Sequence, residues 1–425
     1  MIAAALPANA WQGGWRNGLS YGGLGLPLAF VALPLYVVLP NHYASVYGVP
    51  LAMLGAVLLG TRLLDAVVDP LIGGWADALF GHSPQRAWRA LAVAAVLLAL
   101  GFRALFFPAV EGTTALLWWC AGGLAITYLS FSTVSVIHQA WGARLGGGEA
   151  QRAHIVAWRE GLSLAGVLVA SVLPSLAGLS VVSVVFAVAL AAALALLVRA
   201  PQPRFQPAAS GGPDIGAPLG TSGFRRLLVI FMVNGVAGAV PATLALFFIR
   251  DRLQAAAFEP LFLASYFAAG ALSMPLWVRM VTHFGLARAW LAGMVLAIVT
   301  FAWAALLGSG DVVAYTAVCV ASGIALGADL SLPSALLAGV IQRAGHGERL
   351  EGAYFGWWNF ATKLNLALAA GIALPLLGAF GYTPGSRDPG ALQALSNAYC
   401  LLPCLLKLVA GALLWALWIR KEKDR

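Results

Sequence analysis

The chain has 425 residues, of which 61% are hydrophobic and 10% are charged, and its formal net charge is +9. An ordinary soluble chain carries roughly 25% charged residues, and a soluble fold of this size cannot bury so much apolar surface. The composition therefore excludes a soluble globular protein, a disordered chain, a disulfide scaffold and a nucleic-acid-binding protein. Because the apolar runs are continuous rather than alternating, a β-barrel is also excluded, and we expect an all-α integral membrane protein surrounded by the lipid bilayer.

Apolar runs separated by Pro, Gly and charged residues predict twelve transmembrane helices. They lie near residues 18–42, 49–79, 88–108, 113–138, 154–177, 179–199, 224–249, 258–280, 287–307, 311–341, 352–380 and 396–419. A stretch rich in Pro, Gly and Ser follows the sixth run and is typical of a flexible linker. We therefore expect a six-helix N-terminal half at 1–199, a cytoplasmic linker at 200–222 and a six-helix C-terminal half at 223–425. Two similar halves of this kind are a transporter architecture.

Basic residues are distributed unevenly between alternate loops. If both termini are cytoplasmic, the outer loops carry only Arg250, Arg252 and Arg387, whereas the inner loops and the C-terminal tail are rich in arginine and lysine. Positive charge favours the cytoplasmic side of a membrane. We therefore expect cytoplasmic N- and C-termini and a location in a bacterial inner (plasma) membrane.

Span two contains three charged residues at bilayer depth, Arg62, Asp65 and Asp69, where a charge costs roughly 2.5–3.5 kcal/mol to insert. Their spacing of three and four residues places all three on one face of the helix. One interpretation is a static cluster in which Arg62 neutralises a carboxylate. The other is a coupling site, because a single arginine leaves a second carboxylate to take up a proton or, if the protein is not proton-coupled, a sodium ion with Asp65 and Asp69 as its ligands.

Charged residues in the later spans need partners as well. Lys363 of span eleven needs an acid or a wet cavity, and Asp329 of span ten or the acids of span two could supply the acid. Such a bridge could be static, or it could break and re-form during transport. Lys407 of span twelve has no obvious local partner, which favours snorkelling or a structural role. Asp77, at the inner end of span two, is expected to make a contact at loop level.

Arg159 begins the deeper part of span five, and arginine suits the recognition of carboxylate, phosphate or vicinal hydroxyl groups. It could equally anchor the cytoplasmic end of the helix. Tyrosine and tryptophan at span ends are usually interfacial anchors, although a few stack on ligand rings. The remaining candidate substrate-binding residues are Asp329, Trp358, Asn359 and Tyr128.

Four stretches containing these residues, at 62–73, 141–159, 327–333 and 351–363, resemble in order the glycoside–pentoside–hexuronide cation symporters of the major facilitator superfamily, which include melibiose permease. The resemblance implies that Asp65 and Asp69 form the coupling-cation site, that Lys363 approaches it, and that Arg159 lines the substrate cavity. The sequence departs from the family in lacking an acidic residue in spans one and four. Without an acid in span four, the site lacks one charged ligand for sodium. Without an acid in span one, it lacks one sugar-binding group of the family.

These observations predict a secondary transporter that couples a proton or sodium ion to symport of a sugar or related small polar solute, without a cofactor and as a monomer. Transport of a lysolipid or another amphipathic solute is the main alternative. An enzyme is not expected, because the elbow-like Gly18-Leu-Ser-Tyr-Gly22 has no preceding strand and His346-Gly-Glu348 has no downstream cysteine pair. A sensor built on a transporter fold is a further alternative.

Overall fold

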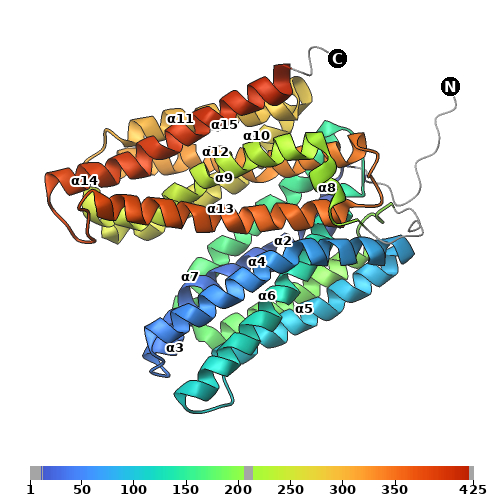
Figure 1. The fold of residues 1–425 in the computed structure, drawn as a ribbon, viewed down its shortest axis with the longest axis horizontal. Coiled ribbons are helices and arrows are strands. Elements are labelled where there is room, and N and C mark those ends of the chain that lie inside the picture. The colour runs from blue at the N-terminus through green and yellow to red at the C-terminus, as the bar shows by residue number, and fades with distance from the viewer. Residues whose placement is uncertain (1–10, 12, 205–213, 421–425) are drawn as a thin grey trace. The chain divides into compact units, whose positions relative to one another are not determined.

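The computed structural model of the protein describes residues 11, 13–204 and 214–420. In this part of the chain every regular element is a helix, which confirms the expected all-α architecture (Figure 1). The predicted linker is described only at its two ends, since residues 205–213 lie outside the described residues.

The first predicted span is divided into shorter helices. It consists of α1 (Trp15–Gly22), α2 (Gly25–Leu33), the π-helical turn η1 (Pro34–Val38) and α3 (Leu39–Ser45). Proline has no N–H and its ring collides with the carbonyl one turn earlier. A wide π turn that begins at Pro34 is therefore a physically reasonable way for this segment to continue as a helix.

The next helices are long. They are α4 (Leu51–His82), α5 (Pro84–Phe106), α6 (Thr113–Ala143) and α7 (Glu149–Val198). Predicted spans five and six together form α7, and Gly178 separates them with a φ of 74°, a backbone conformation that favours glycine. The two apolar parts of α7 are Glu149–Pro174 and Leu176–Val198.

The remainder of the chain alternates long helices with short turns. Its elements are α8 (Ala217–Gly220), α9 (Ser222–Phe247), η2 (Phe248–Arg252), η3 (Ala256–Phe258), α10 (Glu259–Phe284), α11 (Leu286–Ala304), α12 (Val312–Arg343), α13 (Glu351–Ala379), α14 (Pro389–Ser396), η4 (Asn397–Leu401), α15 (Leu402–Leu414) and η5 (Trp415–Ile419).

By length and composition, ten helices of the described part are long and apolar enough to cross a membrane. The first two predicted spans are not among them. The first is divided into short helices, and the second, α4, carries Arg62, Asp65 and Asp69 within its length. The total of twelve spans therefore stays a prediction.

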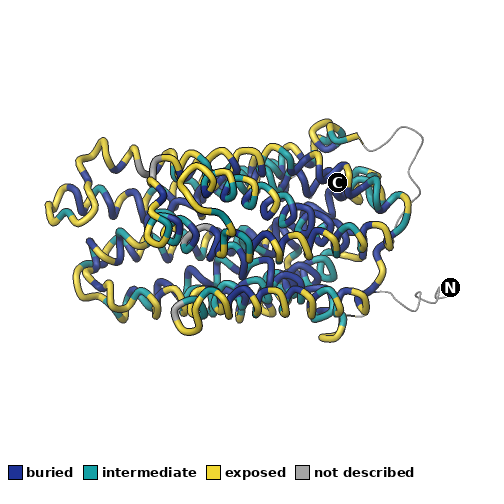
Figure 2. The backbone as a smooth tube through the Cα atoms, turned by 90° about the horizontal axis from the view of Figure 1, so that it is seen from below, coloured by how far each residue is buried: buried dark blue, intermediate teal, exposed yellow. Residues whose placement is uncertain are grey.

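The chain forms two compact units. Unit 1 comprises residues 1–218 and 338–360, and unit 2 comprises residues 219–337 and 361–425. Each unit has its own apolar core, with Phe102 and Phe186 in contact in unit 1 and Phe248 stacked on Tyr399 in unit 2. In Figure 2 many helices carry exposed residues along one side and buried residues along the other, as expected for helices that meet lipid on one face.

Candidate functional site

Helix α4 has two chemically distinct faces. Leu63, Val67 and Leu71 form an exposed apolar stripe, which suits contact with lipid. Asp65 and Asp69 lie on another face and are buried, with 4% and 0% of their surface exposed. The predicted acidic face is thus turned into the protein, whereas Arg62, expected on the same face, is exposed.

Asp65 contacts a hydroxyl group of α6. The Ser132 hydroxyl donates a hydrogen bond of 2.7 Å to Asp65 Oδ1, and both residues are buried. Tyr128, one turn earlier on α6, is also buried and interacts electrostatically with Arg62 and Asp65. A buried carboxylate beside a hydroxyl can take up a proton or contribute oxygen ligands to a small cation. Ser132 is one of several span-four hydroxyls, and its spacing in sequence does not distinguish it from the others.

Asp69 lies where α13 packs closely against α4. A Cβ atom on Gly356 would be 2.6 Å from the Asp69 carbonyl oxygen, and one on Gly73 would be 2.2 Å from the Gly352 carbonyl oxygen. Gly352 and Gly356 are four residues apart on α13, the small-residue spacing that lets helix backbones approach closely in membranes. The glycines therefore hold α13 against the acidic face of α4.

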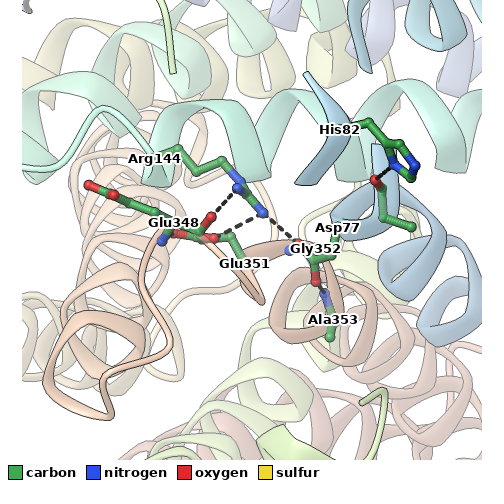
Figure 3. Close-up of polar contacts among 8 residues, drawn as sticks. Asp77, His82, Arg144, Glu348, Glu351, Gly352 and Ala353 are labelled. Carbon is green, nitrogen blue, oxygen red and sulfur yellow. Dashed lines mark hydrogen bonds and ion pairs between the residues drawn. The ribbon is translucent and has the colours of Figure 1, made fainter. Parts of the chain in front are cut away.

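At the end of α4, Asp77 is part of a buried network (Figure 3). Its Oδ1 atom accepts hydrogen bonds of 2.7 Å from Arg144 Nη2 and from the Gly352 N–H, and its Oδ2 atom accepts one of 2.7 Å from the Ala353 N–H. Arg144 Nη2 also lies 3.1 Å from Glu351 Oε2. Asp77 thus satisfies two N–H groups in the first turn of α13, which have no partner within the helix itself.

Asp77, expected to make a contact at loop level, makes it with the ends of two other helices, and the contact is buried. Asp77, Arg144 and Glu351 are 3%, 1% and 2% exposed, and they come from α4, the end of α6 and the start of α13. Sequence reasoning treated Arg144 only as one positive charge of an inner loop. Its partners lie 67 and 207 positions away in sequence, so local spacing carries no signal for the network.

Unit 2 contains a second buried polar network. Lys407 Nζ lies 2.6 Å from Asp329 Oδ2 and donates a bond of 2.9 Å to Asn234 Oδ1. Asn234 Nδ2 and Trp290 Nε1 each donate a bond of 3.0 Å to Asp329 Oδ1. Asp329 therefore forms a salt bridge with Lys407, the lysine for which the sequence indicated no local partner. Of the two interpretations of Lys407, snorkelling is wrong because the side chain is buried, whereas the buried ion pair agrees with a structural role. A bridge between Asp329 and Lys363 stays a prediction.

Arg159 lies in unit 1 and is 6% exposed. Its Nε and Nη2 atoms donate bonds of 2.9 and 2.6 Å to Oε1 of the adjacent Glu160, and Tyr21 interacts with the guanidinium. The Tyr21 hydroxyl also donates to the His138 carbonyl over 3.1 Å. Arg159 therefore has a local counter-ion, which the sequence analysis did not weigh.

The other predicted site residues belong to different units. Trp358, buried, and Asn359, half-buried, lie on the part of α13 that belongs to unit 1. Lys363 is half-buried on the part of α13 that belongs to unit 2. Its approach to Asp65 and Asp69, both in unit 1, stays a prediction. Among the described residues no group of three or more His, Cys, Asp or Glu side chains is arranged to hold a metal ion.

Comparisons with known proteins place this architecture among membrane transporters. The sequence model of a family described as MFS/sugar transport protein matches residues 19–421. The human sodium-dependent lysophosphatidylcholine symporter 1 is 29% identical over 173 residues, a match that covers 40% of this chain and 32% of that protein. The chain thus matches only about a third of the length of this curated relative.

Solved structures support the same fold. A bacterial homologue of the iron transporter ferroportin, in an outward-facing state, has a TM-score of 0.68 at 15% identity and covers 93% of this chain and 99% of its own. The Escherichia coli fucose:proton symporter has a TM-score of 0.62 at 13% identity, covering 93% and 97% of the two chains. The human organic anion transporter MFSD10 has a TM-score of 0.65 at 17% identity, covering 96% and 100%.

Proposed function

The chain belongs to the MFS/sugar transport protein family of the major facilitator superfamily, and on that premise we propose that it is a cation-coupled symporter of a sugar or related small polar solute. Members of this superfamily are membrane transporters that bind small-molecule substrates, not enzymes. In the proposed arrangement twelve helices form two six-helix halves in a bacterial inner membrane, with both termini cytoplasmic. The protein works as a monomer by alternating access.

The observation that carries the coupling proposal is the buried Asp65 carboxylate with the Ser132 hydroxyl 2.7 Å away. A proton or sodium ion that binds there changes the charge of α4 inside the membrane. It thereby changes the relative free energies of the transport states, which is the physical basis of coupling. Asp69 and Lys363 are proposed as further members of the coupling site, and Arg159 as a substrate-binding residue together with Trp358, Asn359, Tyr128 and Asp329.

The proposal is tested by uptake of radiolabelled melibiose and fucose into proteoliposomes under an imposed proton or sodium gradient. The gradient that accelerates uptake identifies the ion. The Asp65→Asn variant should lose gradient-driven accumulation, whereas Glu111→Gln, which changes an exposed acid, should retain it. Gradient-driven accumulation of the same size in Asp65→Asn and in the unmodified protein would contradict the coupling role.

A lysolipid is the second candidate substrate, since the human lysophosphatidylcholine symporter matches part of the chain. Both candidates use the same fold and the same coupling site, so the discriminating measurement is substrate competition. Uptake of labelled lysophosphatidylcholine that neither melibiose nor fucose reduces would favour the lipid. Uptake of a labelled sugar that lysophosphatidylcholine does not reduce would favour the sugar.

A further inference from the structure

The buried network of unit 2 holds one carboxylate with donors from three other helices. Asp329, on α12, accepts two bonds on Oδ1, from Asn234 of α9 and Trp290 of α11, and one on Oδ2, from Lys407 of α15. An ionised carboxylate has about four lone-pair sites. Three are occupied by these donors, which leaves one on Oδ2.

Burial within this network is uneven. Trp290, Asn234 and Lys407 are 0%, 3% and 3% exposed, whereas the Asp329 side chain is 18% exposed. An ionised carboxylate that faced lipid would be costly, and ionisable groups at this depth face protein or a water-filled cavity. The exposed part of the Asp329 side chain is therefore expected to meet water rather than lipid.

The charges within the network cancel. The single positive charge of Lys407 lies 2.6 Å from the single negative charge of Asp329, and Asn234 joins them as acceptor from one and donor to the other. Tyr266 of α10 interacts electrostatically with Asp329, and Cys404 of α15 interacts with Lys407; both groups are neutral in their ordinary forms. A balanced site offers no net attraction to a cation, but it can still accept a hydrogen bond from a hydroxyl group.

We propose that Lys407, Asn234 and Trp290 are positioning residues that keep Asp329 ionised and oriented as the acceptor for one hydroxyl group of a neutral, hydroxyl-bearing substrate. This inference rests on the proposed function, because it assigns the contact that unit 2 makes with the same transported solute. It also separates two roles: Asp65 exchanges the coupling cation, and Asp329 stays charged throughout the cycle.

The protonation state of Asp329 can be measured without any substrate. Dicyclohexylcarbodiimide modifies protonated carboxyl groups, so the full-length protein in detergent is treated at pH 6, 7 and 8, and labelled peptides are quantified by mass spectrometry. We expect negligible labelling of Asp329 in the unmodified protein at all three values. Lys407→Met should raise it at least about tenfold at pH 6, because the carboxylate loses its counter-ion. Lys407→Arg, which keeps the charge, should resemble the unmodified protein.

If Lys407→Met does not fold, Asn234→Ala provides the second variant, since it removes one donor to Asp329 and one acceptor of Lys407. A smaller rise in labelling is expected there. Labelling of Asp329 in the unmodified protein that increases as the pH falls from 8 to 6 would overturn the proposal. So would a folded Lys407→Met in which Asp329 stays unlabelled at pH 6.

The substrate contact is tested separately with the labelled sugar that the proteoliposomes accumulate. The double variant Asp329→Asn/Lys407→Met, which leaves no buried charge unpaired, should raise KM about tenfold with little change in maximal rate, because a hydrogen bond to a charged acceptor becomes one to a neutral acceptor. An unchanged KM would overturn the assigned contact. Failure of the unmodified protein to take up either melibiose or fucose would contradict the proposed sugar transport, whereas the labelling result would still decide whether Asp329 is held ionised.

Discussion

Replacing Arg144 by methionine should destabilise the protein strongly. Arg144 is the only cation that the described contacts place on the Asp77 and Glu351 carboxylates, at 2.7 and 3.1 Å, and all three side chains are at most 2% exposed. Methionine fills much of the same volume but leaves two buried carboxylates without a counter-ion. Breaking a buried ion pair by removing one partner costs roughly 3–5 kcal/mol.

The effect is measured as the midpoint of thermal unfolding in detergent. For a unit of roughly 150–250 residues, 1 kcal/mol changes Tm by about 2–4 °C, so Arg144→Met should lower Tm by on the order of 6–20 °C. Arg89→Met is the matched control, since Arg89 is exposed and should change Tm little. Adding Glu351→Gln to Arg144→Met should restore part of the loss by removing one uncompensated charge. A Tm for Arg144→Met equal to that of Arg89→Met would refute the reasoning.

Three further variants test other contacts. Gly73→Ala should lower Tm and yield, because its Cβ would lie 2.2 Å from a backbone carbonyl oxygen of α13, whereas Gly55→Ala on the same helix meets nothing within 4 Å and should be tolerated. Ser132→Ala should reduce gradient-driven uptake, since the Asp65 carboxylate loses a hydrogen-bond donor; gradient-driven uptake equal to that of the unmodified protein would exclude the hydroxyl from the coupling site. Burial, and then the hydrogen bond to Asp251, raise the pKa of the Tyr382 hydroxyl above its ordinary value of 10.0. The neutral hydroxyl therefore stabilises the folded protein fully below pH 10, and this stabilisation is lost as the pH rises further and the hydroxyl ionises. In Tyr382→Phe, Tm measured between pH 9 and 11 should therefore fall less with rising pH than it does in the unmodified protein.

Composition and periodicity predicted the helical architecture well. A charge content of 10% and long continuous apolar runs are sufficient for a helical membrane protein, because the bilayer requires backbone groups to be satisfied within each segment. The acidic residues of α4 were also predicted to share one face, since a spacing of four residues fixes their direction. Asp65 and Asp69 are indeed buried, while Leu63 and Val67 are exposed.

The partners of those residues could not be predicted in the same way. Helical periodicity states which residues share a face, but it does not state which other helix that face meets. Ser132 lies 67 positions from Asp65, and Arg144 lies 67 positions from Asp77. Local hints at the α4–α13 contact were Gly73 on α4 and the pair of glycines at 352 and 356 on α13; glycine permits close backbone approach, but it does not specify the partner helix.

The partner of Lys407 could have been predicted from the rule that a charged side chain inside a membrane needs an oppositely charged partner or water. Its interpretation as a snorkelling residue rested on the absence of a partner within a turn of its own helix. In a membrane, however, a lysine in the middle of an apolar helix must find an acid or water on any neighbouring helix, however distant in sequence. Asp329 is the acid within α12, and it lies 78 positions away, with its carboxylate 2.6 Å from the ammonium group. Matching each intramembrane cation to the few intramembrane acids, before weighing local alternatives, would have identified Asp329 as a candidate partner of Lys407.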